Sequence, residues 1–372
     1  MPLYATPAKS PELERRLTEL DLQRRYLAQH LGQSAEPWTG ALRRLAAAEA
    51  TVGSTSIEGY GASLEDTVEI LAGRPAAKTS DETQRIIAAY GQAMERVTAF
   101  ADDPQFRWTA QTIAELHFLV CFPQPEARPG RLRDGGIVVT RGAGREPYRP
   151  PGSDSLPALV EEFAAWLRAG DTARHTVIRA AMAHLHLVSI HPFRDGNGRV
   201  ARIIQSLVLA REGVLRPELV SIEPYLGRHT REYYAVLEDV QGTRYEPDRD
   251  ASPWVEFCID AHVSEATERR RWLEVAYTRH DFCEALAATM AYPERFVAAL
   301  DQALLGLPVT NADHRRQAGV ASPTAVQDLQ RLRRDGWLDQ EGGGRSVRYT
   351  ASDKLRERWS AALGAARQRP SL

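Results

Sequence analysis

A helical repeat of apolar residues runs through most of this sequence and limits what it can fold into. Apolar side chains recur at i, i+3 and i+4 spacing, the pattern of amphipathic helices. We expect helices over residues 11–31, 38–52, 63–71, 81–100, 108–120, 156–167, 176–190, 200–211, 231–241, 253–274 and 293–304. The fold class is therefore predicted to be mainly α.

Two short segments break the helical pattern. Residues 137–140 form a β-branched run followed by glycines, which indicates a short hairpin. Residues 336–338 and 347–349 flank the glycines at 342–344 and predict a second hairpin near the C-terminal end. The helical pattern therefore has strand-like interruptions in only these two places.

Composition and charge exclude several classes of protein. At 372 residues the chain has room for two or three domains of about 150 residues each. A formal net charge of −2 argues against a molecule that binds polyanions with its whole surface, so any nucleic-acid contact would need a local patch. Three widely separated cysteines, with no CxxC pair, argue against a disulfide framework and against a structural zinc site.

The apolar runs are too short for a transmembrane helix, which needs about 18 such residues. The first residues also lack the charged start and apolar core of a signal peptide. We therefore expect no membrane contact and a cytoplasmic location. Only three of the 47 basic residues are lysines, a skew typical of GC-rich bacterial genomes.

A polar loop between two apolar helices carries the densest set of chemical groups. The segment is His191-Pro192-Phe193-Arg194-Asp195-Gly196-Asn197-Gly198-Arg199-Val200-Ala201-Arg202. Pro192 disfavours helical geometry at the preceding residue and so ends the first helix. The Gly-Asn-Gly turn can direct backbone N–H groups inward at the start of the next helix, where they would hold anionic oxygens.

The side chains of this segment complete a phosphate site. Arg199 and Arg202 stand at i and i+3 on one helix, and their forked donors suit phosphate oxygens. Asp195 offers the kind of oxygen that Mg²⁺ takes together with substrate phosphates. His191 suits a general base for a hydroxyl nucleophile. The sequence thus predicts a cradle for a Mg²⁺-bound polyphosphate with a base at its mouth.

The segment resembles the signature of the Fic family, His-Pro-Phe-x-Asp/Glu-Gly-Asn-Gly-Arg-x-x-Arg, without a departure. Most members transfer AMP from Mg-ATP to a Ser, Thr or Tyr hydroxyl of a protein. The resemblance implies that His191 deprotonates the hydroxyl, that Asp195 holds Mg²⁺ and that Arg202 reaches the γ-phosphate. It implies phosphate or ATP binding by the residues that lie between them, Gly196, Asn197, Gly198 and Arg199. A glycine at position 198 argues against the Doc-like phosphotransferase branch, which carries a lysine there.

The flanking sequence extends the resemblance over roughly residues 40–265. Residues 130–151 resemble the Fic flap, whose edge at Ile137, Val138 and Val139 would pair with the backbone of a target protein. The segment 231–237 is similar to the helix that follows the signature, which would place Tyr234 near the adenine.

A second motif, Ser54-Thr55-Ser56-Ile57-Glu58-Gly59, lies upstream. Gly59 is a natural helix stop, so Glu58 would lie in the last turn of a helix, where a carboxylate opposes the macrodipole and needs a cation. The segment resembles the inhibitory motif of Fic proteins, Ser/Thr-x-x-x-Glu-Gly/Asn. That resemblance implies that Glu58 pairs with Arg202 and displaces the γ-phosphate.

Residues 307–349 show the order helix, turn, helix, hairpin. This order resembles a winged helix-turn-helix, whose second helix enters the major groove of DNA. From Asp313 to Leu372 there are 12 basic and 7 acidic residues, so this part alone is basic. The DNA contacts would be Thr324, Gln327, Arg331 and Arg345, with Val326, Leu329 and Leu332 together on another side. Winged helices also serve as protein-interaction modules, and that alternative stays open.

Histidines near the signature have a simpler interpretation than metal binding. His184 and His186 stand at i and i+2 on a helix and point apart. We expect His184 to be a buried, hydrogen-bonded core residue rather than part of a three-histidine zinc site with His191.

We therefore expect a Fic-type helical core with a short hairpin flap and a small α+β winged-helix domain. The expected domains are 1–104 with the inhibitory helix, 105–265 as the catalytic core, 266–305 as connecting helices, 306–352 as the winged helix and 353–372 as a basic tail. The activity would be AMP transfer from ATP, with Mg²⁺, to an unknown target protein or to the chain itself, at a low basal rate. A homodimer and donors such as UTP or CDP-choline stay open.

Two other classes of function compete with the transferase. The chain could be a transcriptional regulator whose core senses nucleotide and whose winged helix binds DNA. It could also be a hydrolase that removes AMP from modified proteins with the help of Glu58.

Overall fold

The computed structural model describes residues 2–31, 37–140, 146–213, 216–344 and 347–367. The chain divides into two compact units. The first comprises Met1–Gly32 and Ala46–Thr267, and the second comprises Gln33–Leu45 and Glu268–Leu372. The helices α2 (Pro37–Ile57) and α12 (Ser252–Thr289) contribute residues to both units. The domain boundaries expected from the sequence stay a prediction.

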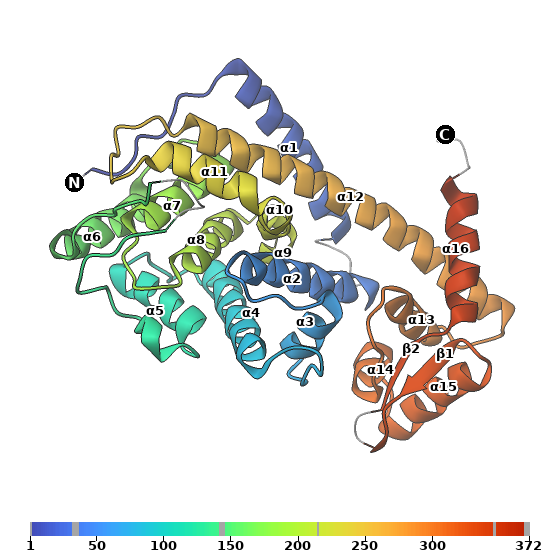
Figure 1. Ribbon diagram of the computed structural model, residues 1–372. Helices are drawn as coiled ribbons and strands as arrows, with labels where there is room; N and C mark the ends of the chain where they lie inside the picture. The colour runs from blue at the N-terminus through green and yellow to red at the C-terminus, as the bar shows by residue number, and fades with distance from the viewer. Residues whose placement is uncertain (1, 32–36, 141–145, 214–215, 345–346, 368–372) are drawn as a thin grey trace. The chain divides into compact units, whose positions relative to one another are not determined.

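The first unit is built from helices (Figure 1). Besides parts of α2 and α12 it contains α1 (Pro11–Leu31), α3 (Leu64–Leu71), α4 (Asp81–Asp102), α5 (Ala110–Cys121), α6 (Leu156–Ala169), α7 (Thr176–Ile190), α8 (Asn197–Arg211), α9 (Pro217–Val220), α10 (Glu223–Arg228) and α11 (Thr230–Gln241). Two short 3₁₀ turns, Pro125–Ala127 and Ser153–Ser155, lie in its loops. The mainly α fold class is thereby confirmed.

The centre of the first unit is the pair α7 and α8, which pack against each other along their length. Both helices are buried over nearly every residue. Helix α7 is apolar on almost all sides, whereas α8 also buries polar and charged side chains at its start. Helices α4 and α5 lie against α8, and Trp254 of α12 donates its indole N–H to the Ala181 carbonyl of α7 at 2.7 Å. The loop that joins α7 to α8 is therefore held by elements from distant parts of the chain.

Helix starts follow capping signals in the sequence. Ser63, Ser80 and Thr109 each accept a hydrogen bond from the backbone N–H three residues later, which fixes the first turns of α3, α4 and α5. Two helix ends lie later than expected. Helix α2 continues through Gly53 and ends only before Gly59, whose φ is +88°. Helix α12 runs to Thr289 because neither glycine nor proline interrupts it after residue 274.

The flap is a hairpin reduced to a single bridge in the part of the chain that the structure describes. Val139 and Tyr148 form one antiparallel pair, with N–H to carbonyl distances of 2.9 and 3.0 Å. Strands over the whole of 137–140 do not form, and residues 141–145 lie outside the described ranges. Within the described ranges, too, no helix has both the length and the apolar content needed to cross a membrane.

The second unit combines helices with a two-stranded sheet. Its further elements are α13 (Phe296–Leu304), α14 (Asn311–Ala318), α15 (Ser322–Arg334), β1 (Leu338–Glu341), β2 (Arg348–Ala351) and α16 (Asp353–Arg367). The strands pair antiparallel, from Leu338 opposite Ala351 to Glu341 opposite Arg348, so the second hairpin is confirmed. The expected basic tail forms α16 over most of its length.

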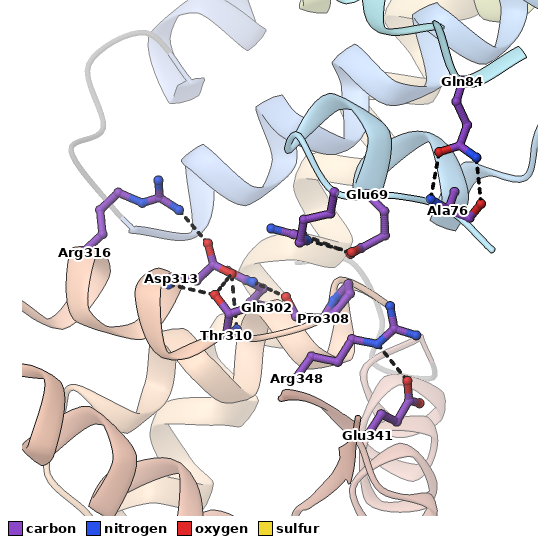
Figure 2. Close-up of polar contacts among 11 residues, drawn as sticks. Glu69, Ala76, Gln84, Gln302, Pro308, Thr310, Asp313, Arg316, Glu341 and Arg348 are labelled. Carbon is purple, nitrogen blue, oxygen red and sulfur yellow. Dashed lines mark hydrogen bonds and ion pairs between the residues drawn. The ribbon is translucent and has the colours of Figure 1, made fainter. Parts of the chain in front are cut away.

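Local polar contacts stabilise the start of a helix and the hairpin in this unit (Figure 2). Thr310 and Asp313 form a capping box at the start of α14, and Arg348 pairs with Glu341 across the hairpin at 2.9 Å. The buried face of α15 contains Ala325, Leu329 and Leu332, whereas Val326 is 39% exposed. The expectation that Val326 shares that face is wrong, because one helical residue turns the side chain by about 100°. A winged helix stays a prediction.

We predict that the buried ion pair of the second unit contributes strongly to its stability. The Arg279 guanidinium donates to Asp301 at 2.8 and 3.3 Å, and the two side chains are 4% and 1% exposed. Arg279→Ala leaves a buried carboxylate uncompensated and should lower the free energy of unfolding by about 3–5 kcal/mol. Arg271→Ala is the control, because its pair with Glu268 is exposed and should contribute about 0–1 kcal/mol. Equal losses in urea unfolding would contradict the prediction.

Candidate active site

The loop between α7 and α8 is fixed by its own backbone geometry. His191 follows the last residue of α7 with φ +50°, and Gly196 precedes α8 with φ +77°. A Cβ atom on Gly196 would lie 2.3 Å from the Cys121 Sγ, so this position requires glycine. The Asn197 side chain accepts from the Phe193 N–H at 3.0 Å and donates to the Phe193 carbonyl at 2.9 Å. Asn197 therefore braces the loop with its side chain, which leaves its backbone N–H at the start of α8 available for a phosphate.

His117 braces the same loop from α5, although it belongs to no motif in the sequence. Its ring stacks on the buried Phe193 ring with centroids 3.8 Å apart and planes 3° apart. Its Nδ1 accepts from the Gly130 N–H at 2.9 Å, so its Nε2 carries the proton and donates to the Asp195 carbonyl at 3.0 Å. Burial lowers the pKa of His117 to about 4, which keeps this bridging form neutral at pH 7.

His191 has the protonation state that a general base needs. Its Nδ1 lies 3.2 Å from the Val188 carbonyl oxygen and donates to it, so the lone pair is on Nε2. Burial, together with the positive charge of Arg133, lowers the pKa of His191 to about 4 although Val188, Glu58 and Asp195 act in the opposite direction. The imidazole is therefore neutral at pH 7 and able to accept a proton.

Asp195 is the only carboxylate of the signature, and its side chain faces solvent. Its side chain is 55% exposed, its Oδ1 accepts from the Gly196 N–H at 2.6 Å, and its Oδ2 lies 3.9 Å from Arg199. In the described ranges no group of three or more His, Cys, Asp or Glu side chains could hold a metal ion. A single exposed carboxylate is the kind of ligand that Mg²⁺ takes when it keeps several of its waters.

The two arginines of the signature are buried but differ in their contacts. Arg199 is 1% exposed, and within the described part of the chain its Nε and Nη1 have no hydrogen-bond partner. Its guanidinium lies 5.9 Å from the Tyr60 ring. Buried donors of this kind are costly unless a ligand satisfies them. The buried donors of Arg199 therefore suit an anion such as phosphate.

Arg202 is instead occupied by α2 and the turn after it. Its Nε donates to Ser54 Oγ at 2.7 Å, and its Nη2 donates to the Ser54 carbonyl at 3.1 Å and to Glu58 Oε1 at 2.6 Å. Burial lowers the pKa of Arg202, but the charge and hydrogen bond of Glu58, together with Tyr233 and Tyr90, outweigh burial and raise it. Glu58 lies one residue beyond the end of α2, in the turn that Gly59 closes. Ser54 and Glu58 thus satisfy Nε and Nη2 of Arg202, whereas its Nη1 has no hydrogen-bond partner among the described residues.

Glycines allow α2 to approach this closely. A Cβ on Gly198 would lie 2.6 Å from Glu58 Oε1, so the carboxylate rests on the first turn of α8. A Cβ on Gly53 would lie 2.2 Å from the Glu223 carbonyl oxygen, and one on Gly227 would lie 2.8 Å from the Gly53 Cα. Helices α2 and α10 therefore cross with their backbones nearly touching. Neither Gly53 nor Gly227 belongs to a motif, so the sequence alone does not point to this crossing.

The remaining candidate residues are placed as follows. Tyr234 is 41% exposed, and its hydroxyl lies 3.5 Å from the Ile57 carbonyl at the end of α2. Val138 in the flap is 46% exposed. The adenine role of Tyr234 and the docking role of the flap stay predictions. His184 is a buried core residue as expected, with Nδ1 2.8 Å from Gln205 and Nε2 3.1 Å from the Tyr233 hydroxyl.

The DNA contacts expected in the second unit are only partly displayed. Gln327 is exposed and Thr324 is half-buried. Arg331 lies over the Tyr292 ring at 4.8 Å and near Asp335 at 3.9 Å, so part of its side chain packs on its own unit. Arg345 lies outside the described residues.

Comparison with known proteins identifies the family to which the signature is similar. Residues 107–209, which include the whole signature, match the model of the Fic/DOC family. The chain is 31% identical over 210 residues to the protein adenylyltransferase Fic of Aedes aegypti. The matched region covers 56% of this chain and 38% of that protein. It is 34% identical over 206 residues to the protein of the same name from Drosophila melanogaster, and this match covers 54% of this chain and 39% of that protein. The chain thus spans less than half the length of these curated relatives.

Two solved structures have a similar fold. A Fic family protein from Desulfovibrio desulfuricans G20 superposes with a TM-score of 0.61 at 21% identity, over 94% of this chain and 98% of that chain. Residues 134–508 of Fic-1 from C. elegans give a TM-score of 0.56 at 22% identity, over 70% of this chain and 72% of that chain. At these identities the likeness concerns the fold.

We predict that His191 stays neutral well below the pH at which a free histidine is protonated. Its pKa of about 4 lies below the ordinary 6.5, so the folded protein resists protonation there and loses stability as the pH falls from about 6.5 toward 4. NMR titration of protein labelled at histidine Cε1 measures this directly, and His191→Ala assigns the resonance. A midpoint near 6.5 would contradict the prediction.

Proposed function

Because the chain carries a Fic domain, we propose that it is a protein adenylyltransferase, which moves AMP from ATP to a hydroxyl group of a protein. The observation that carries this proposal is the buried guanidinium of Arg199, whose Nε and Nη1 have no hydrogen-bond partner in the described part of the chain. These donors lie three residues after Gly196, at the start of α8, where backbone N–H groups and the helix dipole also favour an anion. ATP supplies the phosphates that satisfy them.

The reaction follows from the groups in the loop. The target hydroxyl donates its proton to Nε2 of His191 while its oxygen attacks the α-phosphorus of ATP. The bond between the α-phosphorus and the oxygen bridging to the β-phosphate breaks, and pyrophosphate leaves. The Val188 carbonyl orients the imidazole through Nδ1, so the lone pair stays directed away from the helix. Arg199 stabilises the charge on the phosphates.

Asp195 is the residue that would hold Mg²⁺. When bound, the ion neutralises charge on the phosphates and orients them. The exposure of the Asp195 side chain supports this role, since such an ion keeps part of its water shell.

Glu58 acts as a brake in this proposal. With Arg202 held by Glu58 and Ser54, the γ-phosphate loses a guanidinium partner and ATP binds with its α-phosphorus out of line. The burial of Arg202, at 2% exposed, supports a strong contact, because a charge pair screened from water interacts more strongly than an exposed one. The basal rate of transfer is therefore low.

The target is a protein with an accessible Ser, Thr or Tyr hydroxyl, or the chain itself. We place the reaction in the cytoplasm, which contains ATP and keeps thiols reduced. Three buried cysteines that form no disulfide, Cys121, Cys258 and Cys283, support that location.

The proposal predicts label transfer from α-³²P-ATP. Glu58→Gly frees Arg202 for the γ-phosphate, and a charged hydrogen bond of about 1.5–3 kcal/mol corresponds to a rate increase of about 10–100-fold. Adding His191→Ala removes the base and should lower the rate of the Glu58→Gly protein by at least about 100-fold. The measurement is the initial rate of protein labelling with Mg²⁺, in lysate and with the purified chain alone.

The control is ATP binding by the same variants, measured by calorimetry. Label that rises in the single variant and disappears in the double variant supports transfer. If the Glu58→Gly protein binds Mg-ATP but labels nothing, the transferase proposal is wrong, and nucleotide-dependent DNA binding is tested next. If it instead loses the ability to release AMP from labelled protein, Glu58 also supports hydrolysis.

The same proposal predicts that Gly53→Ala weakens the brake with Glu58 intact. The added methyl group meets the Glu223 carbonyl and must displace α2, which carries Ser54 and Glu58 away from Arg202. We expect labelling to rise by about tenfold, the lower part of the range for losing one charged hydrogen bond. Gly40→Ala is the matched control in the same helix, because its Cβ would meet nothing nearer than 3.9 Å. Equal basal rates in both variants would show that this crossing does not hold the brake.

A further inference from the structure

Arg133, in the loop that leads from α5 to the flap, is nearly buried at 4% exposure although its neighbours Arg131 and Asp134 are exposed. Its guanidinium donates to three backbone carbonyls. Nε donates to His191 at 2.8 Å, Nη1 donates to Gly135 at 2.8 Å, and Nη2 donates to Pro151. Its backbone N–H donates to the Pro192 carbonyl at 3.0 Å. One residue therefore binds four carbonyl oxygens.

These carbonyls belong to two parts of the proposed site. His191 and Pro192 form the turn that ends α7 and carries the base. Gly135 and Pro151 flank the inner part of the flap, residues 136–140 and 146–150, which lie on either side of residues 141–145. A planar guanidinium can donate in three directions at fixed angles, whereas a lysine ammonium on a flexible stem cannot reproduce that fork. The three hydrogen bonds of the Arg133 guanidinium therefore fix the positions of the His191, Gly135 and Pro151 carbonyls relative to one another, in addition to placing a positive charge there.

The backbone of His191 needs such support. Its φ of +50° is in the left-handed region, which is costly for a residue other than glycine unless the surroundings fix it. Arg133 binds the carbonyl of this residue. Tyr148 supplies a second tie from the flap to the same helix end, since its hydroxyl donates to the Ser189 carbonyl at 2.7 Å.

We propose that Arg133 is a positioning residue for AMP transfer, which holds the His191 backbone at a fixed place relative to the flap. A hydroxyl presented at the flap then meets the imidazole within hydrogen-bond reach. This inference rests on the proposed transferase activity, because it assigns Arg133 a part in that reaction. A displacement of about 1 Å in such a site can cost about 100-fold in rate.

The test uses the full chain with Glu58→Gly as background. Arg133→Gln removes the charge and the fork, and Arg133→Lys keeps the charge but loses the fork. We expect kcat for protein labelling to fall by about 10–100-fold in both variants, with the Kd of ATP changed by less than about twofold because Arg133 touches no phosphate-binding group. Arg131→Gln, on an exposed side chain in the same loop, is the matched control and should leave kcat unchanged.

A second readout follows His191 without any turnover. In protein labelled at histidine Cε1, both Arg133 variants should shift the His191 resonance. Arg133→Gln should also raise its titration midpoint, since the nearby positive charge opposes protonation. Arg133→Lys should keep the low midpoint and still lose kcat. Circular dichroism checks folding, and if Arg133→Gln does not fold, Arg133→Lys alone decides.

Each outcome has a definite meaning. A rate restored by Arg133→Lys would overturn the proposal, because charge alone would then suffice. An unchanged His191 resonance in folded variants would overturn it as well. If the Glu58→Gly protein transfers no AMP, the transferase activity fails, and the His191 resonance still decides whether Arg133 positions this residue.

Discussion

The burial of two positive charges on α8 is the physical constraint on which the arrangement of the proposed site depends. Arg199 and Arg202 lie within a helix that is buried over nearly its whole length, and a buried guanidinium is costly without partners. Arg202 meets this demand with Ser54 and Glu58. Arg199 leaves it partly unmet. Nη1 of Arg202 also has no partner among the described residues, so the two arginines differ in how many of their donors the protein satisfies.

Much of this arrangement can be predicted from local sequence. Pro192 ends α7 and Gly196 takes the positive φ that opens α8, because proline and glycine restrict or free the backbone wherever they occur. The residues of the signature are close in sequence, so their spacing along one helix start fixes which can face a phosphate. The need of Glu58 for a cation follows from its place at a helix end, whereas the choice of Arg202 comes from the resemblance to the inhibitory motif.

Other parts depend on contacts that no local pattern encodes. His117 and Arg133 lie 58 or more residues before the backbone groups they bind in the signature loop. Each looks ordinary in the sequence, since their partners are carbonyl oxygens, which every residue has. Gly53 falls inside a helix, where a glycine normally marks an end, and only its crossing with Gly227 explains it. In the second unit, Arg331 belongs to a basic stretch but lies over Tyr292.

Gly198 serves two purposes with one missing side chain. Its hydrogen atom leaves the space into which the Glu58 carboxylate fits, and it stands in the turn of α8 that would receive the phosphates. Any larger residue here would fill the seat of the carboxylate before it altered the helix. The carboxylate would then have to move away from Arg202, so the contact between Glu58 and Arg202 depends on the glycine at position 198.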